Sequence, residues 1–334
     1  MKHENILVYD IGGTTIRAAL YDCKNNSLKS IYKINTPNKY NLDYSSQDDI
    51  LRELEKSIKY LGFKILEENG CQPSYIVVGM PGPVNANGEV LQLPTIVCDP
   101  LNEVYNAKLA IQTIFNTNKC YVVNDITAAG FYFKNENDFC ILSIGSGVGG
   151  KVFISGKPLL GNNSIGGEFG HIKVNYNKQI LCDCGETGHI GSVCSGRGIL
   201  KFVKESAKND YLKFKNSILY NKKNIELIKN EEIVYALNKN DNWTVETIKK
   251  ALQPLVTLVS TLHLTIGIDK FVIIGGFAIA ANKPLKRFFE ESIKENTWDL
   301  GQNFEEMITY GENIDYGLLG CGIIGKERIK YENI

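Results

Sequence analysis

Two segments of the chain share one pattern: a short apolar strand, a turn of glycine and hydroxyl residues, and a second apolar strand. The first spans residues 6–21 with the turn Gly12-Gly13-Thr14-Thr15, and the second spans 139–154 with the turn Gly145-Ser146-Gly147-Val148-Gly149. Each turn joins two strands, whereas P-loop and Rossmann sites need a glycine turn that leads into a helix. The pattern therefore predicts an α/β chain with two glycine-turn hairpins.

These turns have the chemistry of phosphate-binding loops. Gly12 and Gly13 let the backbone approach a ligand closely, and Thr14 and Thr15 offer N–H and hydroxyl donors to phosphate oxygens. Asp10, at the end of the preceding strand, is a residue type that orients magnesium. The first turn alone fits an ordinary hairpin equally well. Two such turns facing each other would hold a triphosphate from both sides.

Composition limits the class of protein and its partners. A chain of 334 residues with 43% hydrophobic content can bury a core of about two domains. Lysine plus arginine and aspartate plus glutamate are balanced at 37 each, so we expect neither nucleic acid nor membrane as a partner. No signal peptide and no apolar run of about 18 residues is found, which predicts a cytoplasmic location. Nine cysteines without framework spacing indicate reduced thiols.

Polar residues follow two further predicted strands. The strand 75–79 leads into a rigid loop with Gly82 and Pro83, at the kind of strand edge where α/β sheets bind ligands. The strand 120–124 delivers Asn124 and Asp125 to a helix start. Asp125 fits either a helix N-cap or a general base that takes a proton from a substrate hydroxyl. The loop at Gly82 also fits a tight turn without a ligand.

Helical spacing of apolar residues predicts helices at 47–69, near 101–115 and at 247–266, and a small-residue helix at 315–325. The strand 270–274 ends in Gly275 and Gly276, where an adenine or ribose could lie against the backbone. A closely packed strand-to-helix turn explains the same pair. Residues 209–245 are rich in lysine and asparagine and predict solvated helices of a peripheral insertion, to which we assign no function.

The order of these motifs resembles one family, the ROK sugar kinases of the actin-like (ribonuclease H-like) ATPase superfold. Its most specific part is the glycine spacing from Gly145 to Gly167-Glu168-Phe169-Gly170-His171. The resemblance implies a two-lobed α/β fold with a nucleotide and sugar cleft between the lobes. A small lobe would hold residues 1–112 and 312–334. A larger lobe, 113–311, would carry a zinc loop at 171–194 and a helical insertion at 205–245.

The resemblance also implies roles for individual residues. Asp125 would be the catalytic base, and Asn124, Glu168 and His171 would bind sugar hydroxyls, with Gly82 and Pro83 beside them. ATP with Mg²⁺ would be bound through Asp10, Gly12, Gly13, Thr14, Thr15, Gly145, Ser146, Gly147, Gly149, Gly275 and Gly276. Ser146 stands where threonine is more usual in the family.

A structural zinc ion is implied next to the sugar. The family run Cys-x-Cys-Gly-x-x-Gly-Cys is Cys182-Asp-Cys184-Gly-Glu-Thr-Gly-His189 here, so histidine replaces the third cysteine. Imidazole binds zinc as well as thiolate does, and His171, Cys182, Cys184 and His189 would complete a tetrahedral site. Cys194 is the competing fourth ligand, and ordinary buried thiols with a loop histidine are the alternative to any metal.

Two further departures concern the substrate. Gly191 stands where the family commonly has a glutamate that binds a sugar hydroxyl, and Gln92-Leu93-Pro94 replaces an Asn-Leu-Pro pattern. The expected activity is ATP-dependent phosphorylation of a sugar at O6, as in glucokinase, by a homodimer. The alternatives are a kinase for an N-acylated amino sugar, fructose, allose or a cyclitol, and, more distantly, a non-catalytic sugar sensor or repressor. The first motif begins at Asp10, which leaves no room for the helix-turn-helix domain of such repressors.

Overall fold

The computed structural model describes residues 4–41, 43, 46–97, 100–174, 180–222, 224–312 and 315–332. The chain divides into two compact units. Unit 1 holds residues 1–137, 153–167 and 313–334, and unit 2 holds 138–152 and 168–312. Within the described residues, no helix is long and apolar enough to cross a membrane.

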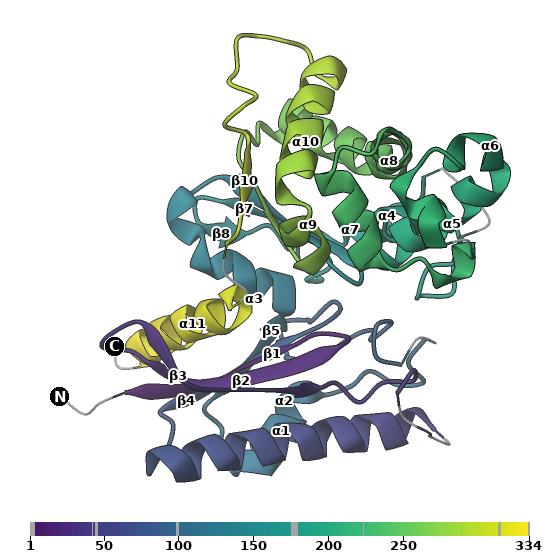
Figure 1. The fold of residues 1–334 in the computed structure, drawn as a ribbon. Coiled ribbons are helices and arrows are strands. Elements are labelled where there is room, and N and C mark those ends of the chain that lie inside the picture. The colour runs from purple at the N-terminus through teal and green to yellow at the C-terminus, as the bar shows by residue number, and fades with distance from the viewer. Residues whose placement is uncertain are drawn as a thin grey trace. The chain divides into compact units, whose positions relative to one another are not determined.

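Unit 1 is built on a five-stranded mixed sheet with the strand order β3-β2-β1-β4-β5 (Figure 1). Its strands are β1 (Asn5–Ile11), β2 (Thr15–Asp22), β3 (Ser27–Asn35), β4 (Tyr75–Met80) and β5 (Cys120–Asn124). β1 and β2 pair antiparallel and enclose the first glycine turn, as the sequence predicts, while β4 and β5 run parallel to β1 and to each other. The carboxyl ends of β1, β4 and β5 therefore meet at one edge of the sheet.

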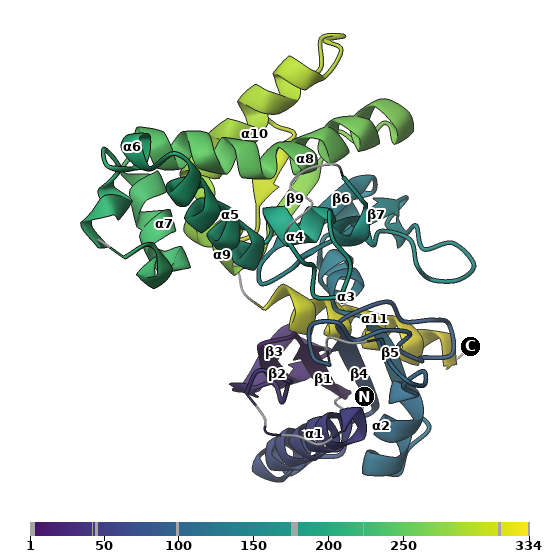
Figure 2. The ribbon, with the colours of Figure 1, turned by 90° about the vertical axis from the view of Figure 1, so that its right-hand side faces the viewer.

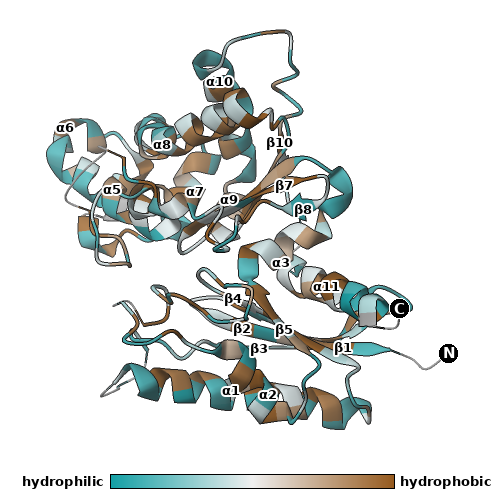
Figure 3. Ribbon diagram, turned by 180° about the vertical axis from the view of Figure 1, so that it is seen from behind, coloured by the Kyte–Doolittle hydropathy of each residue, from teal (hydrophilic) through white to brown (hydrophobic). Residues whose placement is uncertain are grey.

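Helices cover both faces of this sheet, which explains why its central strands are apolar on both sides. Leu7, Tyr9 and Ile11 of β1 face a core shared with α1, and the alternate residues Ile6 and Val8 face a core shared with α11. Figure 3 shows brown, apolar colour over much of the central strands, interrupted by teal, hydrophilic stretches. The helical elements of unit 1 are α1 (Gln47–Asn69), α2 (Ala107–Phe115), α3 (Asp125–Tyr132), η1 (Lys134–Glu136) and α11 (Tyr316–Glu332).

Unit 2 contains the second glycine turn, between β6 (Phe139–Ile144) and β7 (Val148–Ile154). The second sheet has the order β10-β9-β6-β7-β8, with β8 (Lys157–Pro158), β9 (Phe271–Ile274) and β10 (Ile308–Tyr310). β7 continues across the boundary between the units, so its end and β8 fall in unit 1. The predicted second hairpin is confirmed, because β6 and β7 are neighbours in this sheet.

The rest of unit 2 is largely helical (Figure 2). Its helices are η2 (Phe169–His171), α4 (Ile190–Cys194), α5 (Gly196–Asn209), α6 (Tyr211–Phe214), η3 (Ile218–Lys222), η4 (Ile225–Leu227), α7 (Asn230–Asn238), α8 (Asn242–Ile266), α9 (Gly276–Ala280) and α10 (Asn282–Asn296). α8 packs against α10 and α5. The segment expected as a peripheral insertion contributes buried apolar residues, such as Phe214, Ile233 and Leu237, to the core of this unit.

The expected domain boundary near residue 112 is too early. β5 pairs with β4, and α3 packs against α11, so residues 113–137 belong to unit 1. The sequence did not indicate this, because the contacts that decide it join α3 to the far end of the chain.

Candidate functional site

The predicted site residues are divided between the two units. In unit 1, the carbonyl groups of the first glycine turn are all used within the protein. Gly12 O accepts from Thr36 Oγ1 at 2.7 Å, Gly13 O accepts from Asn38 Nδ2 at 2.8 Å, and Thr14 O accepts from Thr36 N at 3.0 Å. Among the described residues, the N–H groups of Gly13 and Thr14 have no such partner. A turn with occupied carbonyls and unengaged N–H groups is suited to an anion.

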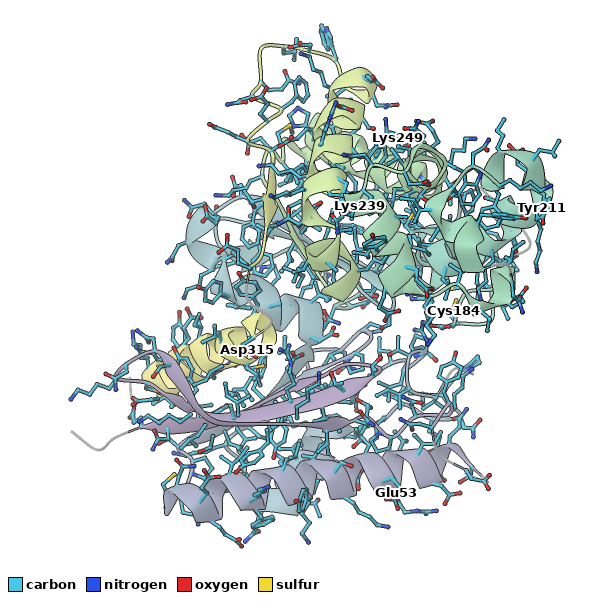
Figure 4. All side chains as sticks on the ribbon, viewed as in Figure 1. Glu53, Cys184, Tyr211, Lys239, Lys249 and Asp315 are labelled. Carbon is cyan, nitrogen blue, oxygen red and sulfur yellow. The ribbon has the colours of Figure 1, made fainter. Side chains whose placement is uncertain are left out.

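Asp10 lies at the end of β1 beside this turn and is held by a small charged network. Arg17 of β2 forms an ion pair with Asp10 and a second one, at 3.1 Å, with Asp315. Asp315 directly precedes α11 (Figure 4). A Cβ atom at Gly317 would lie 2.5 Å from Cγ of Asp10, so a larger residue there would displace this carboxylate. Arg17 and Asp315 were not predicted, because nothing in the sequence joins residues 298 positions apart.

Asn124 and Asp125 lie where β5 leads into α3. The N-cap of α3 is Asn124, whose Oδ1 accepts from Thr127 N at 3.0 Å, and Asp125 is the first helical residue. The capping role considered for Asp125 therefore belongs to its neighbour. Oδ1 of Asp125 accepts from Asn124 Nδ2 at 2.9 Å and from Ile126 N at 2.8 Å, which fixes the orientation of the carboxylate.

The loop after β4 is tied to the same place. Asn124 Nδ2 also donates to Gly82 O at 3.0 Å. Gly82 has φ = 86°, and a Cβ there would lie 2.1 Å from Gln92 O, so the loop itself requires glycine. Gln92 accepts from Leu101 N through its side chain at 3.0 Å and thus serves the loop. Unit 1 brings Gly82, Asn124 and Asp125 together, because β4 and β5 are parallel neighbours whose carboxyl ends meet.

The second glycine turn, in unit 2, repeats the arrangement of the first. Gly145 O accepts from Gly196 N at 2.8 Å, Ser146 O accepts from Arg197 Nε at 2.9 Å, and Gly147 O accepts from Gly145 N at 3.0 Å. In the described part of the chain, the N–H groups of Ser146 and Gly147 donate to nothing. A Cβ at Gly145 or Gly147 would meet no atom within 4 Å, so the turn is open on that side.

Gly275 and Gly276 follow β9 of the same unit. Gly275 has φ = 102°, and a Cβ there would lie 2.6 Å from the backbone of Ile144. Close packing of β9 against β6 therefore explains this glycine. At Gly276 a Cβ would meet nothing within 4 Å, so packing does not explain the second one.

Glu168 directly precedes η2, and His171 is the last residue of η2. Oε1 of Glu168 lies 2.7 Å from Nζ of Lys151, whose side chain is only 2% exposed on β7. Lys151 was not predicted as a site residue. The signal was nonetheless present, because a lysine within the apolar run Val148–Ile154 must be buried with a partner or lie at an edge.

The four predicted metal ligands come together. The ligand atoms of His171, Cys182, Cys184 and His189 all lie within 4.8 Å of one another, and Sγ of Cys184 is 3.3 Å from Nδ1 of His189. Figure 4 shows Cys184 on its loop. Burial lowers the pKa of His189, and His171 adds to this effect, which favours the neutral imidazole that binds metals. Two thiols and two imidazoles are a donor set that suits zinc.

Cys194, the competing ligand, lies elsewhere. It is fully buried in α4, and its Sγ donates to Ala251 O at 3.2 Å. Burial raises the pKa of this thiol to about 12. It is a core thiol.

Gly191 has a packing reason of its own. A Cβ at this position would lie 3.1 Å from Gly170 O, and a Cβ at Gly170 would lie 2.1 Å from Val148 O. β7, η2 and α4 thus approach one another closely through these glycines. A glutamate, which the family resemblance led us to look for at this position, would require the backbone at Gly170 to shift by a few tenths of an ångström.

The fold is that of known two-domain α/β proteins. A ROK family glucokinase from Streptomyces griseus, solved with glucose and AMPPNP, has a TM-score of 0.74 at 20% identity and covers 97% of this chain and 99% of its own. A ROK family transcriptional regulator, a homologue of the E. coli MLC protein, has a TM-score of 0.76 at 20% identity, with 97% and 78% covered. The predicted actin-like α/β fold class is confirmed. The fold alone does not separate a kinase from a regulator.

The family model described as "ROK family" matches residues 7–326. The chain therefore belongs to the ROK family, as the motifs indicated. It is 28% identical over 343 residues to a C(7)-cyclitol 7-kinase of Streptomyces hygroscopicus subsp. limoneus, covering 97% of this chain and 95% of that protein. It is 24% identical over 339 residues to a glucokinase of Thermotoga maritima, covering 98% and 99%. The expected class, a sugar kinase, is confirmed by these relatives.

Proposed function

We propose that this protein transfers the γ-phosphoryl group of MgATP to a hydroxyl group of a hexose or cyclitol, with Asp125 as the general base. The observation that carries the proposal is the junction of β5 and α3. Asn124 supplies the N-cap, so Asp125 is not needed for capping, and its carboxylate is oriented by two hydrogen bonds at the carboxyl edge of the sheet. Such an oriented carboxylate is what abstraction of a hydroxyl proton requires.

In the proposed reaction, the acceptor oxygen attacks the γ-phosphorus in line as its proton passes to Asp125. The bond from phosphorus to the β,γ-bridging oxygen breaks, and ADP leaves. The N–H groups of the two glycine turns and Asp10 would bind the phosphates and magnesium of the donor substrate. Asn124, Glu168 and His171 would bind hydroxyls of the acceptor, with Gly82 and Pro83 beside it and Gly275 and Gly276 against the adenosine.

The assignment of Asp125 is tested by Asp125→Asn. We expect kcat to fall about 10²- to 10⁴-fold, since loss of a general base has that effect, with little change in the KM for MgATP. Asp269→Asn, at an exposed position, is the matched control and should retain full turnover. Near-normal turnover of Asp125→Asn would exclude it as the base.

The acceptor is best identified by a coupled ADP-release assay over a panel of polyols. The panel should include glucose, mannose, fructose, allose, N-acetylglucosamine, N-acetylmannosamine and a C7-cyclitol. The relation to a cyclitol kinase over 97% of the chain supports testing the cyclitol on an equal footing with glucose. For a hexose we expect phosphorylation at O6, which phosphorus NMR of the product would reveal. No transfer to any acceptor would favour a sensor over a kinase.

We further propose that His171, Cys182, Cys184 and His189 hold a structural zinc ion. A closed set of four protein ligands leaves no open position for chemistry, so the ion would order the loop and fix the ring of His171. Metal analysis of the purified protein should find one zinc per chain. Cys184→Ser should lose it, lower the melting temperature and raise the acceptor KM, whereas Cys194→Ser should retain it. Zinc loss in Cys194→Ser instead would assign the fourth position to that thiol.

A further inference from the structure

Lys151 is buried on β7 beside the carboxylate proposed to bind the acceptor. Its side chain is 2% exposed, and its ammonium lies 2.7 Å from Oε1 of Glu168, whose own side chain is 29% exposed. Within the described residues, Glu168 has no other side-chain partner. The pair therefore joins a cation that cannot reach water to a carboxylate that can.

The backbone around Glu168 is fixed against the same strand. A Cβ at Gly170 would lie 2.1 Å from Val148 O, and a Cβ at Gly150 would lie 2.5 Å from Phe169. The segment from Glu168 to Gly170 thus packs directly along β7, and the ion pair adds the side chain of Glu168 to this contact. A buried ammonium without its counter-charge is costly, so Lys151 holds the Glu168 carboxylate beside β7.

We propose that Lys151 is a positioning and specificity-determining residue for the acceptor. Its ammonium takes one acceptor position on Oε1 of Glu168 and leaves the positions on Oε2 to hydroxyl groups of the acceptor. Each carboxylate oxygen carries two acceptor positions, so the ion pair does not fix the number of hydroxyls bound but holds Oε2 in a defined direction. The acceptor class is therefore a ring polyol that is recognised at this point through its hydroxyl groups on Oε2. This inference rests on the proposed function.

A double-mutant cycle on the full-length protein tests the proposal. Lys151→Met keeps the length of the side chain and removes the charge, and Glu168→Gln removes the carboxylate. We expect Lys151→Met to raise the acceptor KM about 10- to 100-fold, the size associated with one hydrogen bond to a charged group, at unchanged KM for MgATP. In the Glu168→Gln background the same change should have no further effect, because the group it positions is gone. Lys157→Met, at an exposed position of β8, is the control and should match the wild type.

Three outcomes would overturn the inference. The first is an acceptor KM of Lys151→Met equal to that of the wild type, and the second is independent effects of the two substitutions. The third is a rise in the KM for MgATP instead of the acceptor KM, which would place the effect on the neighbouring glycine turn. Lys151→Gln, which retains an N–H donor, provides the same measurement if Lys151→Met does not fold, and should show an intermediate acceptor KM. If the wild type phosphorylates no polyol, the proposed function itself fails, which is distinct from an active enzyme that is insensitive to Lys151.

Discussion

The position of Asp10 is set by a residue that has no side chain. A Cβ at Gly317 of α11 would lie 2.5 to 2.8 Å from the three carboxyl atoms of Asp10. What it would displace is the end of a side chain and not the backbone, so the fold can adjust at small cost. The carboxylate, however, would have to leave its place beside Arg17.

Gly317→Ala should therefore impair activity without unfolding the protein. We expect a melting temperature close to that of the wild type and a fall in kcat/KM for MgATP of about tenfold or more, because the carboxylate proposed to orient magnesium is displaced. Steady-state kinetics at varied magnesium, with thermal denaturation alongside, would measure both. Unchanged kinetics would show that Asp10 has no role in binding the metal-nucleotide.

At the level of single residues, the sequence predicted the groups that we propose to carry chemistry, but not the residues that the fold places beside them. Asp10, Asp125 and the cluster from His171 to His189 stand in recognisable local patterns. Arg17, Asp315 and Lys151 act through partners that only the folded chain brings near. At Gly191 the sequence comparison suggested only that a sugar-binding carboxylate is missing. The structure adds that this glycine packs tightly against Gly170, which the sequence did not indicate.

At the level of elements, boundaries were predictable where local capping defines them. The helix predicted at 47–69 is α1 to the residue, because Ser46 caps its first turn and Gly70 ends it with φ = 55°. The helix expected from 101 begins only at Ala107. Residues before it are used differently, since Tyr105 forms a bridge with Val90 and Asn106 supplies the N-cap.

Asp241 fixes the start of α8 and the segment before η3. Its carboxylate accepts from Ser217 Oγ at 2.8 Å, from Ile218 N at 2.9 Å and from Thr244 N at 2.9 Å. Burial alone would raise the pKa of Asp241, but the hydrogen bonds from Thr244, Ile218 and Ser217 outweigh burial and the pKa is lowered. The ionised form is therefore stabilised by folding.

This gives a prediction with a definite pH dependence. A lowered folded pKa contributes stability above the unfolded value of about 3.9, and the contribution is lost as the pH falls from there toward the folded pKa. Asp241→Asn should therefore reduce the free energy of unfolding by about 1–2 kcal/mol at pH 7, since its amide would face the N–H of Ile218. The difference should shrink in urea denaturation below about pH 4. If the difference in unfolding free energy between wild type and Asp241→Asn is the same at all pH values, the prediction is wrong. Asp269→Asn, at an exposed position, is the control.

At the scale of the whole molecule, the C-terminal helix completes the first unit. α11 covers the sheet face formed by residues such as Ile6, Val8 and Val77, and Sγ of Cys321 donates to Tyr9 O at 3.3 Å. A small-residue helix was expected at this place, and the family resemblance placed it in one lobe with the N-terminal residues. Its small residues allow close approach to several neighbours: a Cβ at Gly320 would lie 1.7 Å from the backbone oxygen of Ala128 in α3, and a Cβ at Gly322 would lie 2.2 Å from the ring of Tyr21 in β2.

Gly320→Ala should therefore destabilise unit 1, in contrast to Gly317→Ala one turn earlier. The added methyl group meets backbone, which has to move, and we expect a loss at the upper end of the range of about 1–3 kcal/mol typical of overpacking. Lys330→Ala, at an exposed position of the same helix, should change stability by less than about 0.5 kcal/mol.

Hydrogen exchange of the Gly320→Ala protein should be faster than that of the wild type in β1, β4, α3 and α11, with α8 and β9 of unit 2 unaffected. A chelator that removes the proposed zinc ion should instead speed exchange in unit 2, centred on residues 180–194, and leave unit 1 unaffected. If Gly320→Ala and the chelator each speed hydrogen exchange equally in both units, the two compact units unfold together. The division of the chain into two units would then not correspond to two separately stable parts.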